Sequence, residues 1–344
     1  MSYIKPIKIG SFECPSNLIL APMAGITDTP FRILCLKGGA GLVCAEMVSA
    51  AALQFSSPKS LKMLQIAKEE HPVSMQVFGG DAKSIAEACK LAQAQGADVI
   101  DINAGCPVKK VNKSGAGCVL MKTPEKIAEI VKAAVKSVNI PVTLKTRVSL
   151  NRTENLAPLL VKIAQDNGAA AITLHARAAA DVHSGPPNIK FLESACKAAS
   201  IPVFANGGVL CAQDAKVMFE AGAQAVMIGR GAIGNPFIFT EITKTLNGEN
   251  FEGVSPAQKA RMFLELVEEN VKFYGERTGV SRSKKTVSYW IGGFQNASTI
   301  RENFVRCETL KLARDILSEA IKENYTLYDT NPPNASILRY QKSE

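Results

Sequence analysis

A cysteine within a glycine- and lysine-rich segment is the residue of this chain best placed to do chemistry. Cys106 stands in the run Asp101-Ile-Asn-Ala-Gly-Cys-Pro107, directly after apolar residues 99–102. The apolar run predicts a buried strand, and the asparagine, glycine and proline that follow end it, so Cys106 falls just past the strand's carboxyl end. A thiol outside a periodic core indicates a reactive group at a cleft rather than a packing residue.

The segment after Cys106 is basic and rich in glycine. No acidic residue occurs between Asp101 and Glu125, and glycines allow the backbone to move and to approach a ligand closely. A reactive group beside such a segment indicates a polyanionic substrate. Its lysines are Lys109, Lys110, Lys113 and Lys122.

Composition narrows the class of protein. The 344 residues carry a net charge of +9, are 47% hydrophobic, and include nine cysteines and three histidines. The cysteines form no C-x-x-C pair, which argues against a disulfide framework or a zinc site, so we expect no metal. No apolar stretch of ~18 residues and no secretory signal occur, so we expect a cytoplasmic protein without a membrane span. Core packing is the interpretation for Cys14, Cys35, Cys44, Cys89, Cys196, Cys211 and Cys307.

Eight short apolar runs alternate with segments of helical periodicity over the first 240 residues. The segment from Asp81 to Gly96, for example, begins with an N-cap residue and ends with glycine. The alternation predicts a parallel sheet, and the count of eight favours a closed (β/α)8 TIM barrel over a doubly wound open sheet. The runs are 18–21, 41–45, 73–77, 99–102, 142–144, 171–174, 203–205 and 225–228.

Polar residues follow the predicted strands, at the end where such barrels build their active sites. Glycines after the last two runs and Arg230 fit a phosphate site, because backbone N–H groups can approach an anion there. With Gln76 and Lys145 at the barrel mouth, the cavity suits a phosphorylated planar cofactor such as a flavin. The polar positions are residues 22–25, Glu46, Gln76, Asn103, Cys106, Lys145, Arg147, His175, Arg177, 206–208 and 229–231.

A second domain is expected where the strand signals stop, after Asn235-Pro236. Ser255 followed by proline predicts a helix start, and we place a catalytic barrel at 1–240, a helical domain at 241–325 and a polar tail at 326–344. Basic residues interleaved with aromatics suit phosphate contact and base stacking, although core anchoring explains Trp290 and Phe294 equally well. These residues are Arg277, Arg282, Lys284, Lys285, Tyr289, Trp290 and Phe294.

Taken in order, the motifs resemble the tRNA-dihydrouridine synthases, most closely the bacterial B-type branch, over about residues 5–320. The run with Cys106 and the lysine–glycine segment after it are the most specific part. The motifs are Leu20-Ala-Pro-Met-Ala-Gly-Ile-Thr-Asp28, Met75-Gln-Val-Phe-Gly79, Asp101-Ile-Asn-Ala-Gly-Cys-Pro107, Leu144-Lys-Thr-Arg147, Leu174-His-Ala-Arg177, Ala205-Asn-Gly-Gly208 and Ile228-Gly-Arg-Gly231.

The resemblance implies an FMN-dependent barrel that reduces the C5–C6 bond of uridines in tRNA, or in another structured RNA, with NADPH as reductant. It also implies that a C-terminal helical domain grips the RNA and that Cys106 is the general acid. We expect the protein to be a monomer. Implied FMN contacts are Pro22, Met23, Ala24, Gln76, Lys145, His175, Asn206, Gly207, Gly208, Gly229 and Arg230. RNA contacts are assigned to Asn103, Lys109, Lys110, Lys113, Arg177, Arg282, Lys284 and Lys285.

The chain departs from the family pattern around the predicted RNA contacts. Residues 178–180 are alanines where threonine and arginine are usual, His183 replaces an aromatic residue, and Thr286 precedes the Tyr289-Trp290 pair where histidine is frequent. Two other functions stay open. An FMN barrel acting on a small molecule, such as a dihydroorotate or enoate reductase, leaves the lysines without a purpose, whereas a non-catalytic RNA-binding or chaperone role makes Cys106 dispensable.

Overall fold

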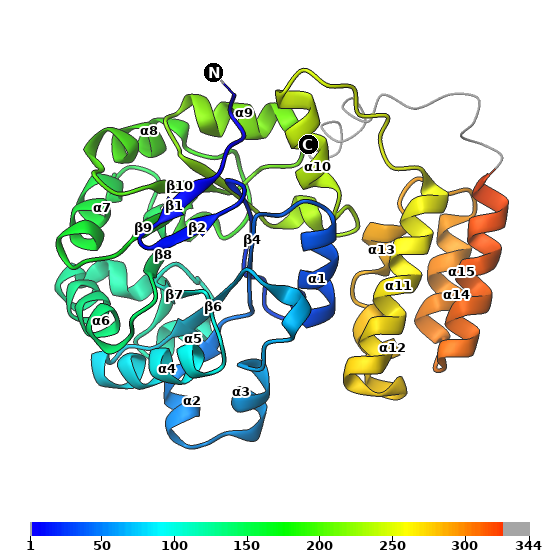
Figure 1. Ribbon diagram of the computed structural model, residues 1–344, viewed down its shortest axis with the longest axis horizontal. Coiled ribbons are helices and arrows are strands. Elements are labelled where there is room, and N and C mark those ends of the chain that lie inside the picture. Colours follow the sequence, from blue (N-terminus) through cyan, green and yellow to red (C-terminus); the bar gives the residue numbers. More distant parts are fainter. Residues whose placement is uncertain (1, 326–344) are drawn as a thin grey trace. The chain divides into compact units, whose positions relative to one another are not determined.

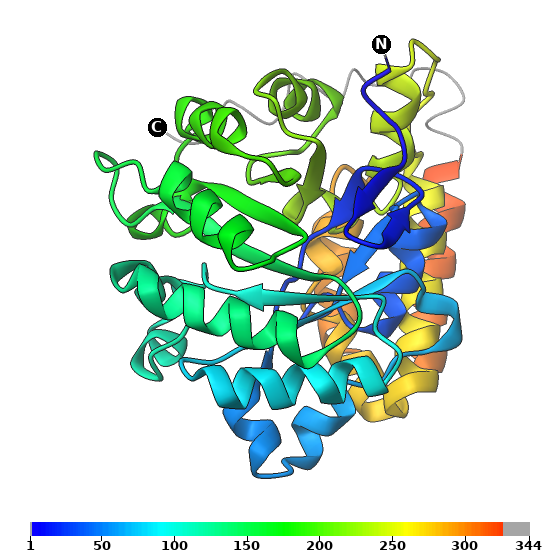
Figure 2. The same ribbon diagram turned by 60° about the vertical axis from the view of Figure 1, so that its left-hand side comes forward.

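Eight parallel strands close into a barrel in the computed structural model, which describes residues 2–325 (Figures 1 and 2). The strand order is β4-β3-β11-β10-β9-β8-β7-β6-β5, and a further pairing of β4 with β6 closes the barrel, so that the two-residue β5 (Val48–Ser49) is an extra strand on β6. The predicted closed barrel is confirmed, and all eight predicted strands are present. Their bounds are β3 Leu18–Leu20, β4 Leu42–Cys44, β6 Val73–Phe78, β7 Val99–Asn103, β8 Val142–Ser149, β9 Ala171–Ala178, β10 Val203–Asn206 and β11 Ala225–Ile228.

Helices join the strands and cover the outside of the barrel (Figure 1). In α4 (Ala82–Ala94), the Asp81 side chain accepts a hydrogen bond from Ser84 N at 2.7 Å, and Gly96 after the helix has a φ of +95°. The predicted cap and stop residues therefore act as expected. The other α-helices of the barrel unit, which ends at Gly229, are α1 Thr29–Lys37, α2 Ala50–Gln54, α3 Pro58–Met63, α5 Lys109–Lys113, α6 Pro124–Ser137, α7 Ala157–Asp166, α8 Ile189–Ala198 and α9 Ala212–Glu220.

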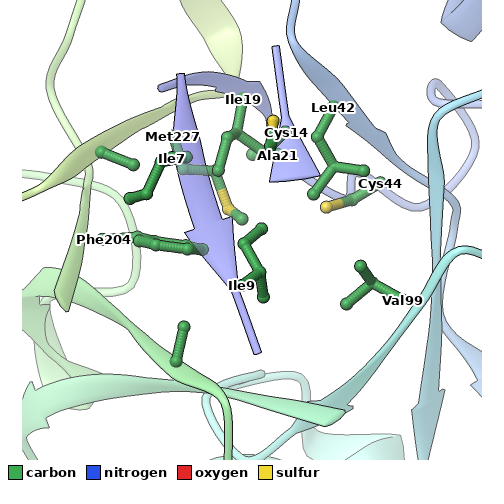
Figure 3. Close-up of a cluster of buried hydrophobic side chains, with 12 residues drawn as sticks. Ile7, Ile9, Cys14, Ile19, Ala21, Leu42, Cys44, Val99, Phe204 and Met227 are labelled. Carbon is green, nitrogen blue, oxygen red and sulfur yellow. The ribbon is translucent and has the colours of Figure 1, made fainter. Parts of the chain in front are cut away.

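A hairpin that the sequence did not reveal closes the amino-terminal end of the barrel. Strands β1 (Ile7–Ile9) and β2 (Phe12–Cys14) are antiparallel, and their apolar side chains lie among the first residues of several barrel strands (Figure 3). Ile9 is fully buried and shares this cluster with Phe204 and Met227. Two strands of three residues are too short for a reliable periodic signal.

The interior of the barrel changes from apolar at the hairpin to polar at the carboxyl end. Along β7, side chains two residues apart share a face. Val99, which belongs to the apolar cluster, is therefore followed on the same face by Asp101 and then, nearer the mouth, by Asn103. Both polar residues are buried. The same strand thus contributes to the closed end and to the open mouth.

The second compact unit begins at Arg230, whereas the sequence placed the boundary at 240. Helix α11 starts as predicted, since Ser255 accepts a bond from Gln258 N and the glutamine side chain accepts one from Ser255 N. The bounds are α10 Ile238–Leu246, α11 Pro256–Tyr274, α12 Glu276–Ser283, α13 Val287–Trp290, α14 Ala297–Arg306 and α15 Leu310–Tyr325. The predicted tail, 326–344, lies outside the described residues.

An aromatic core holds the helices of the second unit together. Trp290 is fully buried, and its ring stacks on Phe263 with centroids 5.5 Å apart; Phe263 also packs on Phe304 at 4.9 Å. Phe294 is buried as well. Of the two interpretations of Trp290 and Phe294, core anchoring is therefore correct and base stacking is wrong. Within residues 2–325, no helix is long and apolar enough to cross a membrane.

Candidate active site

The segment that carries Cys106 is fixed by the last residue of β7. Asn103 Oδ1 accepts hydrogen bonds from Gly105 N at 3.2 Å and from Cys106 N at 3.0 Å. Gly105 lies against β8, where a Cβ would come within 3.0 Å of the Thr146 carbonyl carbon. The backbone therefore turns tightly, as the predicted strand end required, and it turns around an asparagine side chain.

A second contact fixes Cys106 from the lysine–glycine segment. Its carbonyl accepts a hydrogen bond from Cys118 N at 3.0 Å. Gly117 has a φ of +71°, and a Cβ there would lie 2.5 Å from the Cys106 carbonyl oxygen, so this close approach requires glycine. Hydrogen bonds at both its N–H and its carbonyl therefore fix the backbone of Cys106.

The Cys106 thiol is half-buried, and burial raises its pKa. The Val108 N–H bond and the charges of Arg147 and Lys145 only partly oppose this effect. At neutral pH the group is therefore a thiol that holds its proton. Cys118 is buried, and its sulfur lies 3.5 Å from Asn112 Nδ2, which indicates a packing role.

The remaining cysteines largely follow the packing interpretation. Most of them are buried, while one on α8 and one at the N-cap of α9 are half-buried. Buried members are Cys14, Cys35, Cys44, Cys89 and Cys307, and half-buried members are Cys196 and Cys211.

A network of buried polar side chains lies beneath the cysteine loop. Asp101 accepts from Thr143 Oγ1 at 2.6 Å and from Gln76 Nε2 at 2.6 Å. Gln76 Oε1 accepts from Asn103 Nδ2 at 2.9 Å. Burial raises the pKa of Asp101 to about 6, against the bonds from Thr143 and Gln76 and the charge of Lys145. The sequence had marked Gln76 and Asn103 but assigned no role to Asp101 and Thr143.

Lys145 and Asn206 meet across the mouth of the barrel. The lysine Nζ donates to Asn206 Oδ1 at 2.9 Å, and Asn206 Nδ2 donates to the Met227 carbonyl at 2.8 Å. Burial lowers the pKa of Lys145 to about 8, although Asp101 raises it. The ammonium therefore stays charged at neutral pH and loses its proton more readily than a surface lysine.

His175 is a neutral ring among cations. Burial is the main cause that lowers its pKa strongly, and the charges of Lys145, Arg147 and Arg177 lower it further. His183 stacks on it with ring centroids 5.9 Å apart. The ring can therefore offer a hydrogen-bond donor and an acceptor without a charge.

Two arginines of the strand ends make bonds to backbone carbonyls. Arg147 is buried and donates to Gly105 O at 2.9 Å and to Ala178 O at 3.0 Å. Arg177 is also buried and donates to Gly185 O at 2.8 Å. Both therefore support loops at the barrel mouth.

Three glycines follow β10 and β11, where a phosphate site was predicted. Gly207 and Gly208 have φ values of +106° and +86°. Among the hydrogen bonds of residues 2–325, none has the N–H of Gly207, Gly208 or Gly229 as donor. A row of such donors suits an anion. Arg230 belongs to the second unit, so its contact with that anion stays a prediction.

The loop with Pro22, Met23 and Ala24 rests on interactions that the sequence did not reveal. Met23 N donates to Thr27 Oγ1 at 2.9 Å, and Gly25 N donates to the Glu46 carboxylate. Arg32, on α1, donates to the Thr27 carbonyl at 2.6 Å and to the buried carboxylate of Glu70 at 2.6 Å. A long-range ion pair of this kind leaves no local sequence pattern.

The predicted RNA contacts differ in their exposure and in the unit to which they belong. Lys109, Lys110 and Lys113 are exposed on α5, a few residues after Cys106, whereas Asn103 and Arg177 are buried with partners inside the barrel. In the second unit, Arg282 lies over the Tyr274 ring at 4.4 Å from its centroid. Lys284 and Lys285 follow α12 and are half-buried and exposed, respectively.

Solved structures share this barrel. Morphinone reductase in complex with tetrahydroNAD aligns with a TM-score of 0.54 and 13% identity, covering 70% of this chain and 90% of that one. The old yellow enzyme from Trypanosoma cruzi aligns with a TM-score of 0.55 and 12% identity, covering 75% and 95%. These likenesses show the fold, and the fold with its polar mouth and half-buried thiol defines a (β/α)8-barrel enzyme.

The sequence comparisons give the family. The dihydrouridine synthase (Dus) family model matches residues 19–326. The tRNA-dihydrouridine synthase B of Pseudomonas aeruginosa is 39% identical over 304 residues, covering 88% of this chain and 92% of the relative. That of Vibrio cholerae is 38% identical over 313 residues, covering 90% and 97%. The chain belongs to the dihydrouridine synthase family, which confirms the resemblance.

Proposed function

We propose that this enzyme reduces the C5–C6 double bond of uridine in tRNA, with FMN as its cofactor and NADPH as its reductant. The observation that carries the proposal is the half-buried Cys106 thiol at the barrel mouth, fixed through its own N–H and carbonyl and kept protonated by burial. Family membership supports the reaction, and the exposed lysines beside the thiol support an RNA substrate.

The residues at the mouth fit FMN. The N–H groups of Gly207, Gly208 and Gly229 suit its phosphate, and Arg230 would add a forked charge. Lys145 would face the ring, where its charge stabilises the anionic reduced form. The same site would include Gln76, His175, Asn206 and the loop of Pro22, Met23 and Ala24. When bound, FMN supplies the hydride that reduces C6 of the base.

Cys106 would deliver the proton. Its thiol donates to C5 of the uracil ring and becomes a thiolate, which takes a proton back from solvent before the next turnover. Its raised pKa favours the protonated form that the step needs. Arg147 and Asn103 hold the loop, so the sulfur stays in place while the base enters. Asn103 and Arg177 would then shape the base pocket more than contact phosphates.

Two basic elements would bind the RNA. Lys109, Lys110 and Lys113 are exposed on α5, which begins three residues after Cys106, and they would contact phosphates next to the target nucleotide. Arg282, Lys284 and Lys285 of the second unit would contact a different part of the RNA. Drawing the target base out of its stack costs a few kcal/mol, which these phosphate contacts help to offset.

The test compares Cys106→Ala with Cys118→Ala, twelve positions away and buried. We expect Cys106→Ala to keep FMN and its reduction by NADPH and to lose most dihydrouridine formation, by roughly 10²–10⁴-fold for a general acid. Cys118→Ala should keep both reactions, since Cys118 packs against Asn112. Full dihydrouridine formation by Cys106→Ala would refute the acid role.

A triple substitution of Arg282, Lys284 and Lys285 by alanine tests the RNA assignment against a small-molecule reductase. We expect weaker tRNA binding and a shallower dependence of log affinity on log salt, by about 0.7–0.9 per lost contact. Flavin reduction by NADPH should be unchanged in the same preparation. Unaltered tRNA affinity at every salt concentration would favour the small-molecule function.

A further inference from the structure

A chain of hydrogen bonds leads from a buried carboxylate to the backbone of the proposed acid. Thr143 Oγ1 and Gln76 Nε2 each donate to Asp101 at 2.6 Å, and Asn103 Nδ2 donates to Gln76 Oε1 at 2.9 Å. Cys106 N then donates to Asn103 Oδ1 at 3.0 Å. These residues come from three adjacent strands and the loop after β7. Asp101 is 1% exposed, so it does not reach a substrate itself.

The groups at the two ends of this hydrogen-bond chain determine which way the amides between them point. An ionised carboxylate only accepts hydrogen bonds, and a backbone N–H only donates them. Gln76 must therefore turn its NH2 group toward Asp101 and its oxygen toward Asn103. Asn103 must turn its NH2 group toward Gln76 and its oxygen toward the N–H groups of Gly105 and Cys106. A reversed amide at either position would set like groups against each other.

We propose that Asp101 is a positioning residue for the Cys106 thiol, which it holds in place by fixing the amide orientations of Gln76 and then Asn103. The proposal rests on the acid role given to Cys106 above. The Gln76 amide is thereby also fixed in one orientation toward the proposed cofactor. Its second N–H and second oxygen lone pair are the groups left for a ligand, because the first of each is used inside the chain.

The choice of a carboxylate at this depth supports an orienting role. Burying a charged group is costly, and burial raises the pKa of Asp101 to about 6. The groups that face it are the ammonium of Lys145 on β8 and the thiol of Cys44 on β4, besides the bonds from Thr143 and Gln76. A neutral side chain would be less costly there, but a carboxylate, unlike an amide or a hydroxyl, offers the glutamine only an acceptor.

Thr143 makes a discriminating substitution possible. Its hydroxyl also lies 3.3 Å from the Ile100 carbonyl, to which it can donate instead. In Asp101→Asn, the new amide can accept from Gln76 through its oxygen and donate its NH2 group to Thr143. The direction of the chain is then kept without a charge. In Asp101→Ala the hydrogen-bond chain loses the acceptor at its buried end. In Asp101→Asn/Thr143→Val the NH2 group of the new asparagine loses the Thr143 hydroxyl as its acceptor.

The experiment follows the position of the thiol in the full-length protein without relying on turnover. Iodoacetamide alkylation of Cys106 is measured by peptide mass spectrometry, with half-buried Cys196 on α8 as the internal reference. We expect Asp101→Ala and the double variant to change the Cys106 rate at least about tenfold, and Asp101→Asn to stay within about twofold of wild type. Cys196 should react at the same rate throughout.

Uridine reduction by the flavin-loaded enzyme gives the second readout. Asp101→Ala should lower kcat at least about tenfold with KM for tRNA unchanged, and Asp101→Asn should restore kcat. A structural role alone would not separate the alanine and asparagine variants in this way. If Asp101→Ala does not fold, the proposal is tested by comparing Asp101→Asn with the double variant, because the substituted side chains have nearly equal volumes.

Three results would overturn the proposal. These are wild-type alkylation of Cys106 in Asp101→Ala, equal impairment of the asparagine and alanine variants, or an unimpaired double variant where alanine does not fold. Failure of the acid role is a separate outcome, because it appears as full uridine reduction by Cys106→Ala. The alkylation rates would still report whether Asp101 positions the loop.

Discussion

Replacing Gly207 with alanine should disturb the mouth of the barrel more than its small size suggests. At a φ of +106°, a Cβ would lie 2.5 Å from His175 Cδ2 and 2.8 Å from His175 Nε2. The ring cannot simply retreat, because Arg177 Nη1 lies 3.4 Å from its Nε2 and His183 stacks on it. Alanine therefore meets both an unfavourable backbone conformation and an obstructed volume.

The two effects can be separated with Gly96 as a matched control. Gly96 has a φ of +95°, and a Cβ there would meet no heavy atom of the described residues within 4 Å. Gly96→Ala should therefore lower the free energy of unfolding by about 1–2 kcal/mol, for the left-handed backbone alone. Gly207→Ala should add about 1–3 kcal/mol for overpacking against His175, giving a total of about 2–5 kcal/mol.

Urea unfolding of both variants measures this difference. Far-UV circular dichroism follows the whole chain, and fluorescence of Trp290, the single tryptophan, reports the second unit separately. We expect the midpoint of the barrel transition to fall further in Gly207→Ala, with the Trp290 signal unchanged in both variants, and retained flavin per chain to fall only in Gly207→Ala. Equal losses of stability would show that the close approach to His175 does not matter.

Three further outcomes are expected. Arg230→Ala should remove a charge-assisted contact of about 1.5–3 kcal/mol and weaken flavin retention at least about tenfold, checked by flavin per chain after gel filtration. Because the pKa of Lys145 is lowered to about 8, flavin retention should fall as pH rises through that value, and Lys145→Arg should abolish the dependence. Gly279→Ala should place a Cβ 2.5 Å from Val271 backbone atoms and destabilise the second unit by about 1–3 kcal/mol, seen as an earlier Trp290 transition.

The barrel was predictable because its strands carry their signal locally. Each strand is a short buried run, and the polar residue at its end, such as Asn103 or Asn206, reaches the mouth through topology alone. The second unit was also expected, but its boundary was placed at 240 and not at Arg230, because it was set by the end of the strand signals, after Asn235-Pro236. Local pattern does not show which unit a helix packs with.

The features that escaped prediction depend on contacts between distant residues. Arg32 and Glu70 form their ion pair across 38 positions, and Asp101 meets Thr143 across 42. In the sequence Asp101 reads as one more strand residue, and its role appears only when β6 and β8 lie on either side of it. Trp290 was ambiguous for a related reason, since an aromatic residue beside basic ones suits either a core or a nucleic-acid surface.

The hairpin at the closed end of the barrel has a consequence for how the chain acquires its structure. Residues 7–14 are synthesised before all eight barrel strands, yet they pack against Phe204 and Met227, about 200 positions later. The cluster around Ile9 and Cys14 therefore remains incomplete until nearly all of the barrel has been made, and its contacts with Phe204 and Met227 must close very long loops. We expect the hairpin to dock late in folding, so that the part of the barrel that is made earliest is the part that completes it.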